Sequence, residues 1–268
     1  MHGAPNLIDL HTHIVSGYDD GASDGAESVA MARLWAADGV TTVAATPHVG
    51  AYSWGPPPVD LPERCAALEQ RIAGEGLQLS IVPSSEIYLT ADTIRLLASR
   101  ENGHRPLGES HYVLVEFSLG GISAPPDDAF FGLQMAGWRP ILAHAERYQA
   151  FQRKPERLGD LLGRGVLAQV TAGSLLGEFG SKAKQLGEQL IELDLCAVMA
   201  SDAHHAAVRR PRMADARARL VELVGEVAAE RLCRLNPAAV LADESIGVGG
   251  DPGDLKGSQR SFLGVFGL

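Results

Sequence analysis

The sequence predicts an α/β fold in which helices cover a parallel sheet, and three observations support this prediction. Short apolar runs recur along the chain, stretches with helical spacing separate most of them, and 268 residues with 46% hydrophobic content suffice for one large core. Alternating strands and helices are typical of parallel sheets. Because there are seven apolar runs, we favour a closed or nearly closed barrel over an open sheet, although the periodicity fits both.

Each element is expected from a particular segment. The seven apolar runs are expected to form buried strands at residues 6–10, 41–46, 77–83, 112–117, 140–144, 167–171 and 196–201. Helical spacing covers 27–39 and 155–165, and each of these stretches ends in a glycine where a C-cap is expected. Two segments fall outside the pattern. Residues 49–62, rich in proline and aromatic residues, are expected to form a rim loop, and residues 247–259 are typical of a flexible linker.

Charge and cysteine content narrow the functional classes. Lys and Arg number 23 against 33 Asp and Glu, a net charge of -10 that opposes nonspecific binding to nucleic acid or to an anionic membrane. The three cysteines, Cys65, Cys196 and Cys233, suggest neither a disulfide framework nor a thiolate zinc site. Neither a signal peptide nor a membrane-spanning run is visible, so we expect a soluble, cytoplasmic protein without membrane insertion.

Nearly every expected strand ends in a residue that can bind a metal ion. After the first strand, His11 and His13 share one face because side chains alternate along extended backbone. The carboxyl ends of the strands in a β/α barrel lie at one face, so such residues should converge there. The expected ligands are His11, His13, Asp20, His48, Glu86, Glu116, His144, Asp202 and His204.

Ligands of this kind imply bound metal. Each residue alone could be an ordinary surface or hydrogen-bonded group, but four carboxylates buried together without cations would be costly or would become protonated. Nine ligands exceed the needs of one ion, and open positions must remain for water and substrate. We therefore expect two to three divalent ions. Imidazole and carboxylate donors suit manganese, iron or zinc.

The motifs DLHTH, DDG, TPH, EIYL, EFS, AHAERY and SDAH, in this order, resemble the PHP (polymerase and histidinol phosphatase) superfamily. Within it, the chain is most similar to the bacterial manganese-dependent protein-tyrosine phosphatases of capsule and exopolysaccharide gene clusters. The resemblance implies a distorted (β/α)7 TIM-like barrel (the PHP fold) over residues 1–245, followed by a Gly-rich C-terminal tail at 246–268. It also implies hydrolysis of phosphotyrosine on a protein, with an autophosphorylating tyrosine kinase of polysaccharide export as the partner. The resemblance leaves the oligomeric state open, and a homo-oligomer is one of the possibilities.

The same resemblance assigns the ligands to three ions. One ion would be surrounded by His11, His13, Glu86 and Asp202. A second would share Glu86 and be held by Glu116 and His144. The third would be held by Asp20, His48 and His204.

The resemblance also bears on the substrate. Arg147 and Arg210 match arginines that the family places near the substrate phosphate, and Arg209 is the alternative to Arg210. The loop after His48 lacks the basic residues of the family, so a small phosphate ester such as histidinol phosphate stays an alternative substrate. In this loop Tyr52 and Trp54 could stack on a phenyl ring or form a hydrophobic lid. An amidohydrolase is a further alternative, but two strand-end glutamates and the closing SDAH fit it poorly.

Several other residues are expected to have ordinary roles. Cys65 and Arg71 have the Cys-x5-Arg spacing of thiol phosphatases, but the sequence between them is helix-forming. Asp9 is expected to orient a ligand imidazole. The remaining histidines are expected to be solvated: His2, His104, His111 and His205.

Overall fold

The computed structural model describes residues 6–50, 57–120 and 127–255. Its strands are β1 (Leu7–Thr12), β2 (Val40–Ala45), β3 (His48–Val49), β4 (Ser80–Pro83), β5 (Glu86–Tyr88), β6 (Tyr112–Glu116), β7 (Arg139–Leu142), β8 (Leu167–Thr171) and β9 (Cys196–Ala200). Every expected apolar run contains a strand. The short strands β3 and β5, which begin at His48 and Glu86, were not expected.

The strands form two sheets in which all paired strands run parallel. One sheet has the order β1-β2-β4 and the other has the order β3-β5-β6-β7-β8-β9. The two sheets are neighbours along the chain, because β2 leads into β3 and β4 leads into β5 after two residues each. They also meet at the far side, where Thr12 bridges Ala203 and the Asp202 N–H donates to the His11 carbonyl at 2.9 Å. The parallel α/β architecture is therefore confirmed.

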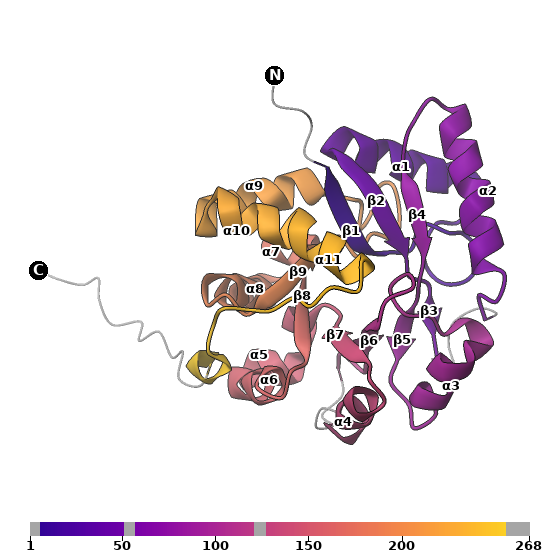
Figure 1. Ribbon diagram of the computed structural model, residues 1–268. Coiled ribbons are helices and arrows are strands. Elements are labelled where there is room, and N and C mark those ends of the chain that lie inside the picture. The colour runs from indigo at the N-terminus through magenta and orange to yellow at the C-terminus, as the bar shows by residue number, and fades with distance from the viewer. Residues whose placement is uncertain (1–5, 51–56, 121–126, 256–268) are drawn as a thin grey trace, which may run out of the picture.

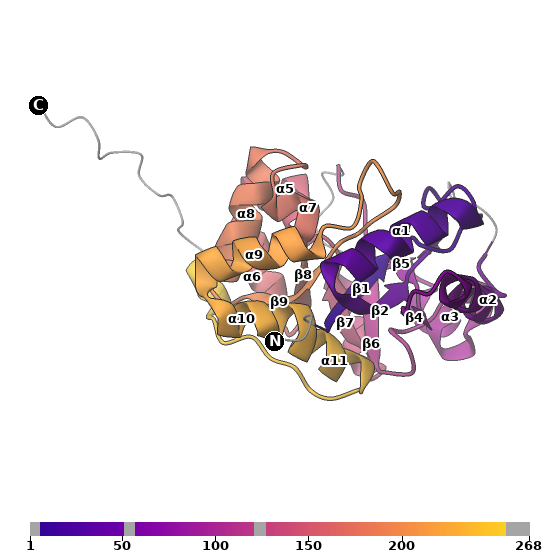
Figure 2. The ribbon, with the colours of Figure 1, turned by 90° about the horizontal axis from the view of Figure 1, so that it is seen from above.

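Helices lie outside the strands (Figures 1 and 2). They are α1 (Gly25–Asp38), α2 (Leu61–Gly74), α3 (Thr93–Ser99), α4 (Asp127–Met135), α5 (Gln149–Arg153), α6 (Pro155–Leu162), α7 (Ala172–Leu175), α8 (Ser181–Glu192), α9 (Met213–Val224), α10 (Glu226–Glu230) and α11 (Asn236–Leu241). Shorter helical turns are η1 (Glu101–Gly103), η2 (Ala145–Arg147), η3 (Arg231–Leu235) and η4 (Pro252–Leu255). None of the helices in the described ranges is long and apolar enough to cross a membrane.

Helix α1 shows how local sequence sets these boundaries. The Asp24 side chain accepts from the N–H groups of Ala26 and Glu27, which satisfies two donors that the first turn leaves free. Gly39 ends the helix with a φ of 79°, the left-handed conformation that favours glycine. Both expected helical stretches, 27–39 and 155–165, are thus confirmed as α1 and α6, although α6 ends at Leu162.

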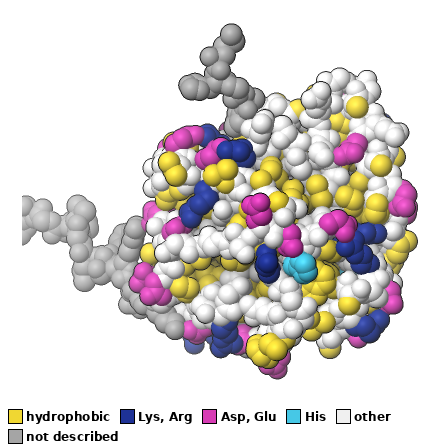
Figure 3. All heavy atoms as spheres, in the orientation of Figure 1, with side chains coloured by type: hydrophobic (Ala, Val, Ile, Leu, Met, Phe, Trp, Pro, Cys, Tyr) yellow, Lys and Arg dark blue, Asp and Glu magenta, His cyan; other side chains and the backbone are white. Residues whose placement is uncertain are grey.

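The core lies on both sides of the strands. The larger cluster packs strands against helices and includes the fully buried Trp35 of α1. A smaller cluster lies between strands and joins Leu10, Ala44, Leu114, Ile141 and Val198 from β1, β2, β6, β7 and β9. Charged side chains of both signs are interspersed with hydrophobic ones over the face shown in Figure 3. Apolar packing therefore stabilises the strands along their length, and the polar side chains that could form a site lie at the strand ends.

The expectation of a flexible linker is wrong for residues 247–255. Leu255 is 1% exposed, and the carbonyl of Pro252 approaches Gly159 of α6 so closely that a Cβ at Gly159 would lie 2.5 Å from it. Leu255 and Pro252 thus pack against α6, and Leu255 belongs to the larger core cluster. The packed structure therefore extends past residue 245. Residues 256–268 lie outside the described residues, as do residues 51–56 with Tyr52 and Trp54.

Candidate metal centre

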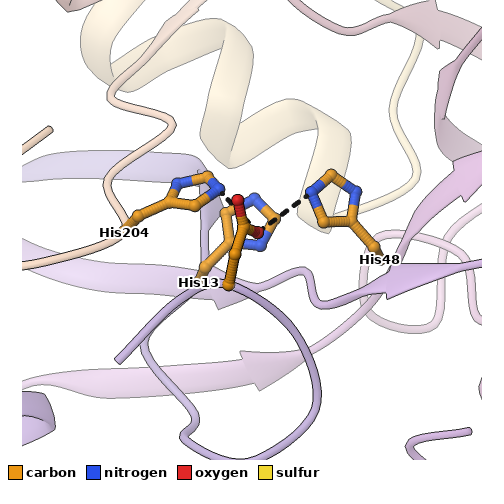
Figure 4. Close-up of side chains that lie close together, drawn as sticks. His13, His48 and His204 are labelled. Carbon is orange, nitrogen blue, oxygen red and sulfur yellow. Dashed lines mark ion pairs between the residues drawn. The ribbon is translucent and has the colours of Figure 1, made fainter. Parts of the chain in front are cut away.

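The nine expected ligand residues lie together at the carboxyl ends of the strands. Three groups bring their ligand atoms within 4.8 Å of one another: His13, Asp20, His48 and His204; His11, His13 and Asp202; and His48, Glu86 and Glu116. The ninth residue, His144, joins them through Glu86. All are buried except Asp20. In Figure 4, His13, His48 and His204 come from three separate segments and turn toward a common centre.

Glu86 lies at the middle of this cluster. Its Oε2 atom is 3.0 Å from both His11 Nε2 and His48 Nδ1 and 3.4 Å from His13 Nε2, while its Oε1 atom is 2.8 Å from His144 Nε2. Its neighbour His48 is also its register partner across β3 and β5. A carboxylate oxygen has two lone pairs, so hydrogen bonds do not account for three convergent nitrogens. Imidazole and carboxylate groups that converge in this way are donors suited to a metal ion.

The grouping agrees in part with the expected assignment to three ions. His11, His13 and Asp202 form one group, as expected. His48 lies 2.9 Å from Glu116 Oε1 and 3.6 Å from Asp20 Oδ1, so it stands between the second and third expected groups. Two residues, His13 and His48, therefore each belong to two groups, and the division of ligands among ions stays a prediction.

Burial and the mutual charges of its members set the ionisation of the cluster. Burial by itself raises the pKa of Asp202, but the charges of His11 and Arg209 outweigh it and hold that pKa well below its usual range. Burial likewise opposes ionisation of Glu86, and His11 and His48 lower its pKa well below the usual range. Burial together with His13 lowers the pKa of His204 to about 4. Asp202 and Glu86 are therefore charged, and their charges in turn outweigh burial and raise the pKa of His11. His204 is neutral near pH 7, so its lone pair is available for a cation.

Two ligand residues adopt an uncommon backbone conformation. His144 has a φ of 38° and Asp202 has a φ of 53°, in the left-handed region that side chains other than glycine rarely occupy. Such strain persists where the surrounding structure over-determines it, and it gathers at functional sites. Each residue lies two positions after the end of a strand, β7 or β9. The left-handed conformation there directs its side chain toward the cluster.

Sequence reasoning missed two residues that orient the imidazoles. Asp19 accepts from His13 Nδ1 at 2.7 Å and from the His48 N–H at 3.0 Å. The Gln169 side-chain oxygen lies 3.0 Å from His11 Nδ1 and accepts from the His144 N–H at 2.9 Å. Partners of this kind at Nδ1 of His13 and His11 leave Nε2 of these two rings facing the cluster. The available signals were the acid next to Asp20 and a glutamine inside an apolar strand.

The expected role of Asp9 is corrected. Its carboxylate accepts from Trp35 Nε1 at 2.8 Å and from the Ser201 N–H at 2.9 Å, and it contacts no imidazole nitrogen among the described residues. Asp9 thus ties β1 to the turn that carries Asp202. The carboxylate of Asp9 faces the Trp35 indole and backbone N–H groups rather than an imidazole, which explains the difference.

The remaining histidines divide into buried and exposed ones. His104 is 1% exposed, and its Nδ1 lies 3.0 Å from the Glu101 carbonyl, so the expectation that it is solvated is wrong. His111 is exposed and His205 is partly exposed, so both reach solvent as expected. His2 lies outside the described residues.

Two arginines border the cluster, and one of them differs from the expected pair. Arg147 Nη1 and Arg209 Nη2 each donate to Asp202 Oδ2 at 2.6 Å. Arg210 is exposed and lies near Asp38 instead. The Arg209 carbonyl accepts from the His204 N–H, and Arg209 has a φ of 52°, so this tight turn points Arg209 inward and Arg210 outward. Of the two neighbours, Arg209, the alternative to Arg210, is therefore the one that borders the cluster.

Cys65 lies inside α2, as its helix-forming surroundings predict. Its side chain is 2% exposed, and burial raises the pKa of its thiol to about 12. A thiolate nucleophile is disfavoured there.

The comparisons with known proteins agree with this geometry. A model of the family "Capsular polysaccharide synthesis, CpsB/CapC" matches residues 7–242. The tyrosine-protein phosphatase YwqE of Bacillus subtilis is 34% identical over 76% of this chain and 79% of its own length. The tyrosine-protein phosphatase CpsB of Streptococcus pneumoniae is 29% identical over 90% of this chain and 100% of its own.

The structural comparison gives the same neighbours. A solved structure described as YwqE from Bacillus subtilis and CpsB from Streptococcus pneumoniae, "unique metal-dependent tyrosine phosphatases", superposes with a TM-score of 0.84 and 31% identity, covering 90% of this chain and 97% of that one. The family model covers most of the chain, and its matched residues include all nine residues of the cluster. The chain belongs to the CpsB/CapC family of capsular polysaccharide synthesis.

Proposed function

We propose that this chain is a metal-dependent protein-tyrosine phosphatase, a phosphoric monoester hydrolase. The observation that carries the proposal is the convergence of nine buried or half-buried ligand side chains beside two arginines. The relatives in the same family are named tyrosine-protein phosphatases. The substrate we propose is phosphotyrosine on an autophosphorylated tyrosine kinase of polysaccharide export, and we keep the cytoplasmic location expected from the sequence.

The donor set fits two to three divalent ions, with manganese as the first choice and iron or zinc as alternatives. The residues that would hold them are the five imidazoles and four carboxylates of the cluster, which offer no thiolate. When bound, such ions supply an activated water near neutral pH and positive charge opposite the phosphate oxygens. A local positive site can therefore attract a phosphate dianion to a protein whose net charge is -10.

The arginines supply the second part of the phosphate site. Arg147 and Arg209 already direct guanidinium N–H groups at one carboxylate oxygen of Asp202, so their donors converge on a point where an anionic oxygen is accommodated. Guanidinium groups bind two phosphate oxygens at once, which orients the substrate and stabilises charge that develops during hydrolysis. Asp19 and Gln169 hold the imidazoles in the orientation that this requires.

We also propose that the two sheets form one distorted seven-stranded barrel of the PHP type. In this arrangement β2 with β3, and β4 with β5, would each count as one interrupted strand. The contacts of Thr12 and His13 with Ala203 after β9 support closure on the other side. A barrel of this kind explains why residues up to 193 positions apart, from His11 to His204, share one site.

One observation keeps a second substrate class open. Between His48 and Arg64 the sequence holds no basic side chain, which leaves a small phosphate ester such as histidinol phosphate as an alternative substrate. The discriminating experiment compares kcat/KM of the manganese-loaded protein for a phosphotyrosine peptide and for histidinol phosphate. We expect the peptide to be preferred by at least about tenfold. Preference for histidinol phosphate would favour the alternative, and hydrolysis of neither would reject both.

A further inference from the structure

The two arginines of the site share one aromatic ring. Arg147 Cζ lies 4.1 Å from the centroid of the Phe179 ring, and Arg209 Cζ lies 5.8 Å from it. Both guanidinium groups also donate to the same oxygen of Asp202. Two cations that converge on one acceptor repel each other, whereas the negative face of an aromatic ring attracts both.

The fold holds Phe179 in place without help from the arginines. Phe179 follows α7, and a Cβ at Gly173 of that helix would lie 2.9 Å from Cε2 of the ring, so the ring rests directly on the helix backbone. The preceding residue, Glu178, accepts from Arg212 Nη1 at 2.7 Å. Gly177 and Gly180 on either side have φ values of 91° and 87°, which only glycine adopts readily. The position of the ring is therefore set by the backbone around it.

The arginines, in contrast, need such a support. Arg147 and Arg209 are 16% and 26% exposed, and each has a long side chain with several rotatable bonds. Without a fixed surface, each guanidinium group could turn toward solvent and would lose entropy on returning to the cluster. Stacking on a rigid ring removes that freedom in advance.

We propose that Phe179 is a positioning residue that holds both guanidinium groups over the metal cluster, ready for the substrate phosphate. This inference rests on the proposed phosphatase function and adds a residue that touches neither metal nor phosphate. It predicts that the aromatic face of residue 179, and not its bulk, sets the affinity of the site for phosphate.

The first test is kcat/KM of the manganese-loaded protein for a phosphotyrosine peptide. Phe179→Leu keeps apolar bulk but removes the ring, and we expect a loss of roughly 3- to 30-fold. Phe179→Tyr keeps the ring and should stay within about twofold of the wild-type value. The matched control is Phe131→Leu on α4, where the phenylalanine is 64% exposed and belongs neither to the cluster nor to the contacts of its two arginines. Equal losses in the Leu and Tyr variants, or no loss in the Leu variant, would overturn the proposal.

A double-mutant cycle separates positioning from a general structural role. In a background that carries Arg147→Ala and Arg209→Ala, Phe179→Leu should cause no further loss, because the groups that it positions are absent. A full additional loss in that background would contradict the proposal. Manganese content, measured by elemental analysis, should be unchanged in all these variants.

Phosphate binding tests the proposal without turnover, and a variant at a second position tests it without a change at Phe179. Inorganic phosphate should bind the manganese-loaded Phe179→Leu protein more weakly, by the same 3- to 30-fold as above in calorimetry. Gly173→Ala offers a second perturbation, since its methyl group would lie 2.8 Å from Glu178 Oε2 and 2.9 Å from Cε2 of the ring, so both side chains must shift. It should weaken phosphate binding in the same direction. Unchanged binding in both variants would overturn the role of Phe179. Absence of peptide hydrolysis by the wild-type protein would instead overturn the proposed function.

Discussion

Strands β6 and β7 carry polar side chains at both ends, and the two ends differ in what surrounds these side chains. At the amino ends, His111 and Arg139 lie 2.6 Å and 3.6 Å from Asp243; His111 is exposed to solvent and Arg139 is partly exposed. At the carboxyl ends, Glu116 and His144 lie 3.7 Å apart and are buried beside Glu86.

The difference shows that the candidate functional end is marked by how many charged and imidazole side chains gather there and by their burial, and not by residue type alone. Water screens the exposed group around Asp243, whose carboxylate has His111 and Arg139 as partners, so no further charge is needed to stabilise it. The buried group brings several carboxylates and imidazoles together where solvation is lost, and such an arrangement is stable only with additional positive charge. The same two strands thus end in an ordinary surface cluster on one side and in a candidate metal centre on the other.

The largest effect is expected from Glu86→Gln, which removes the charge at the centre of the buried end and keeps the shape. Because four imidazoles surround this carboxylate, the variant should no longer retain its metal, and its kcat/KM should fall by at least about 1,000-fold. Asp243→Asn is the matched control at the exposed end and should leave both unchanged. Wild-type activity in Glu86→Gln would remove the distinction between the two ends.

The next effect is expected from Arg147→Ala. Loss of a guanidinium group that binds phosphate oxygens should lower kcat/KM by roughly 30- to 1,000-fold without loss of metal. Arg147→Lys keeps the charge but not the planar fork, so it should recover only part of this loss. Arg210→Ala, which alters an exposed neighbour, is the control and should stay within about twofold of the wild-type value. A loss for Arg210→Ala as large as for Arg147→Ala would restore Arg210 to the site.

Gln169→Leu should affect metal affinity more than the chemistry. The glutamine oxygen is the partner of His11 Nδ1 and of the His144 N–H, and removal of such partners weakens metal binding by roughly 10- to 100-fold. Competition with a chelator of known affinity would measure this change. The exposed Gln134, which contacts the Arg164 carbonyl, supplies the control Gln134→Leu. Equal metal affinities in the two variants would count against an orienting role for Gln169.

The smallest effect is expected from Cys65→Ser. The thiol is buried within α2, its pKa is raised to about 12, and it lies in none of the groups that could hold a metal among the described residues. Hydrolysis should therefore stay within about twofold of the wild-type rate. The protein itself should become less stable, because the substitution buries a hydroxyl group. Loss of all activity, with metal content intact, would point to a thiol mechanism.

The gathering of the nine expected ligand residues could be predicted from sequence because most of them follow an apolar run, and parallel strands bring their ends together. That they bind metal stays a prediction. His11 and Asp202 are examples of residues that such a pattern identifies. Arg209 could not be chosen over Arg210, since a single turn with positive φ decides which side chain points inward. Gln169 and Phe179 could not be found either, because their roles depend on contacts with residues distant in the sequence.

The fold shows the same division. Apolar runs predicted the main strands, but the short strands β3 and β5 depend on pairing between His48 and Glu86, which carry no apolar pattern of their own. The contact of Leu255 with α6 was also missed, because glycines around it are typical of a linker and the partner surface lies nearly a hundred positions earlier in the chain.

Manganese titration of chelator-treated protein tests the central claim most directly. Bound ions per chain and hydrolysis of a phosphotyrosine peptide would be measured in the same samples. We predict no hydrolysis before manganese is added, binding of about two to three ions per chain, and activity that appears only after more than one ion has bound. Full hydrolysis in excess chelator, or full activity with a single bound ion, would contradict the assignment of the buried cluster as a multinuclear metal centre.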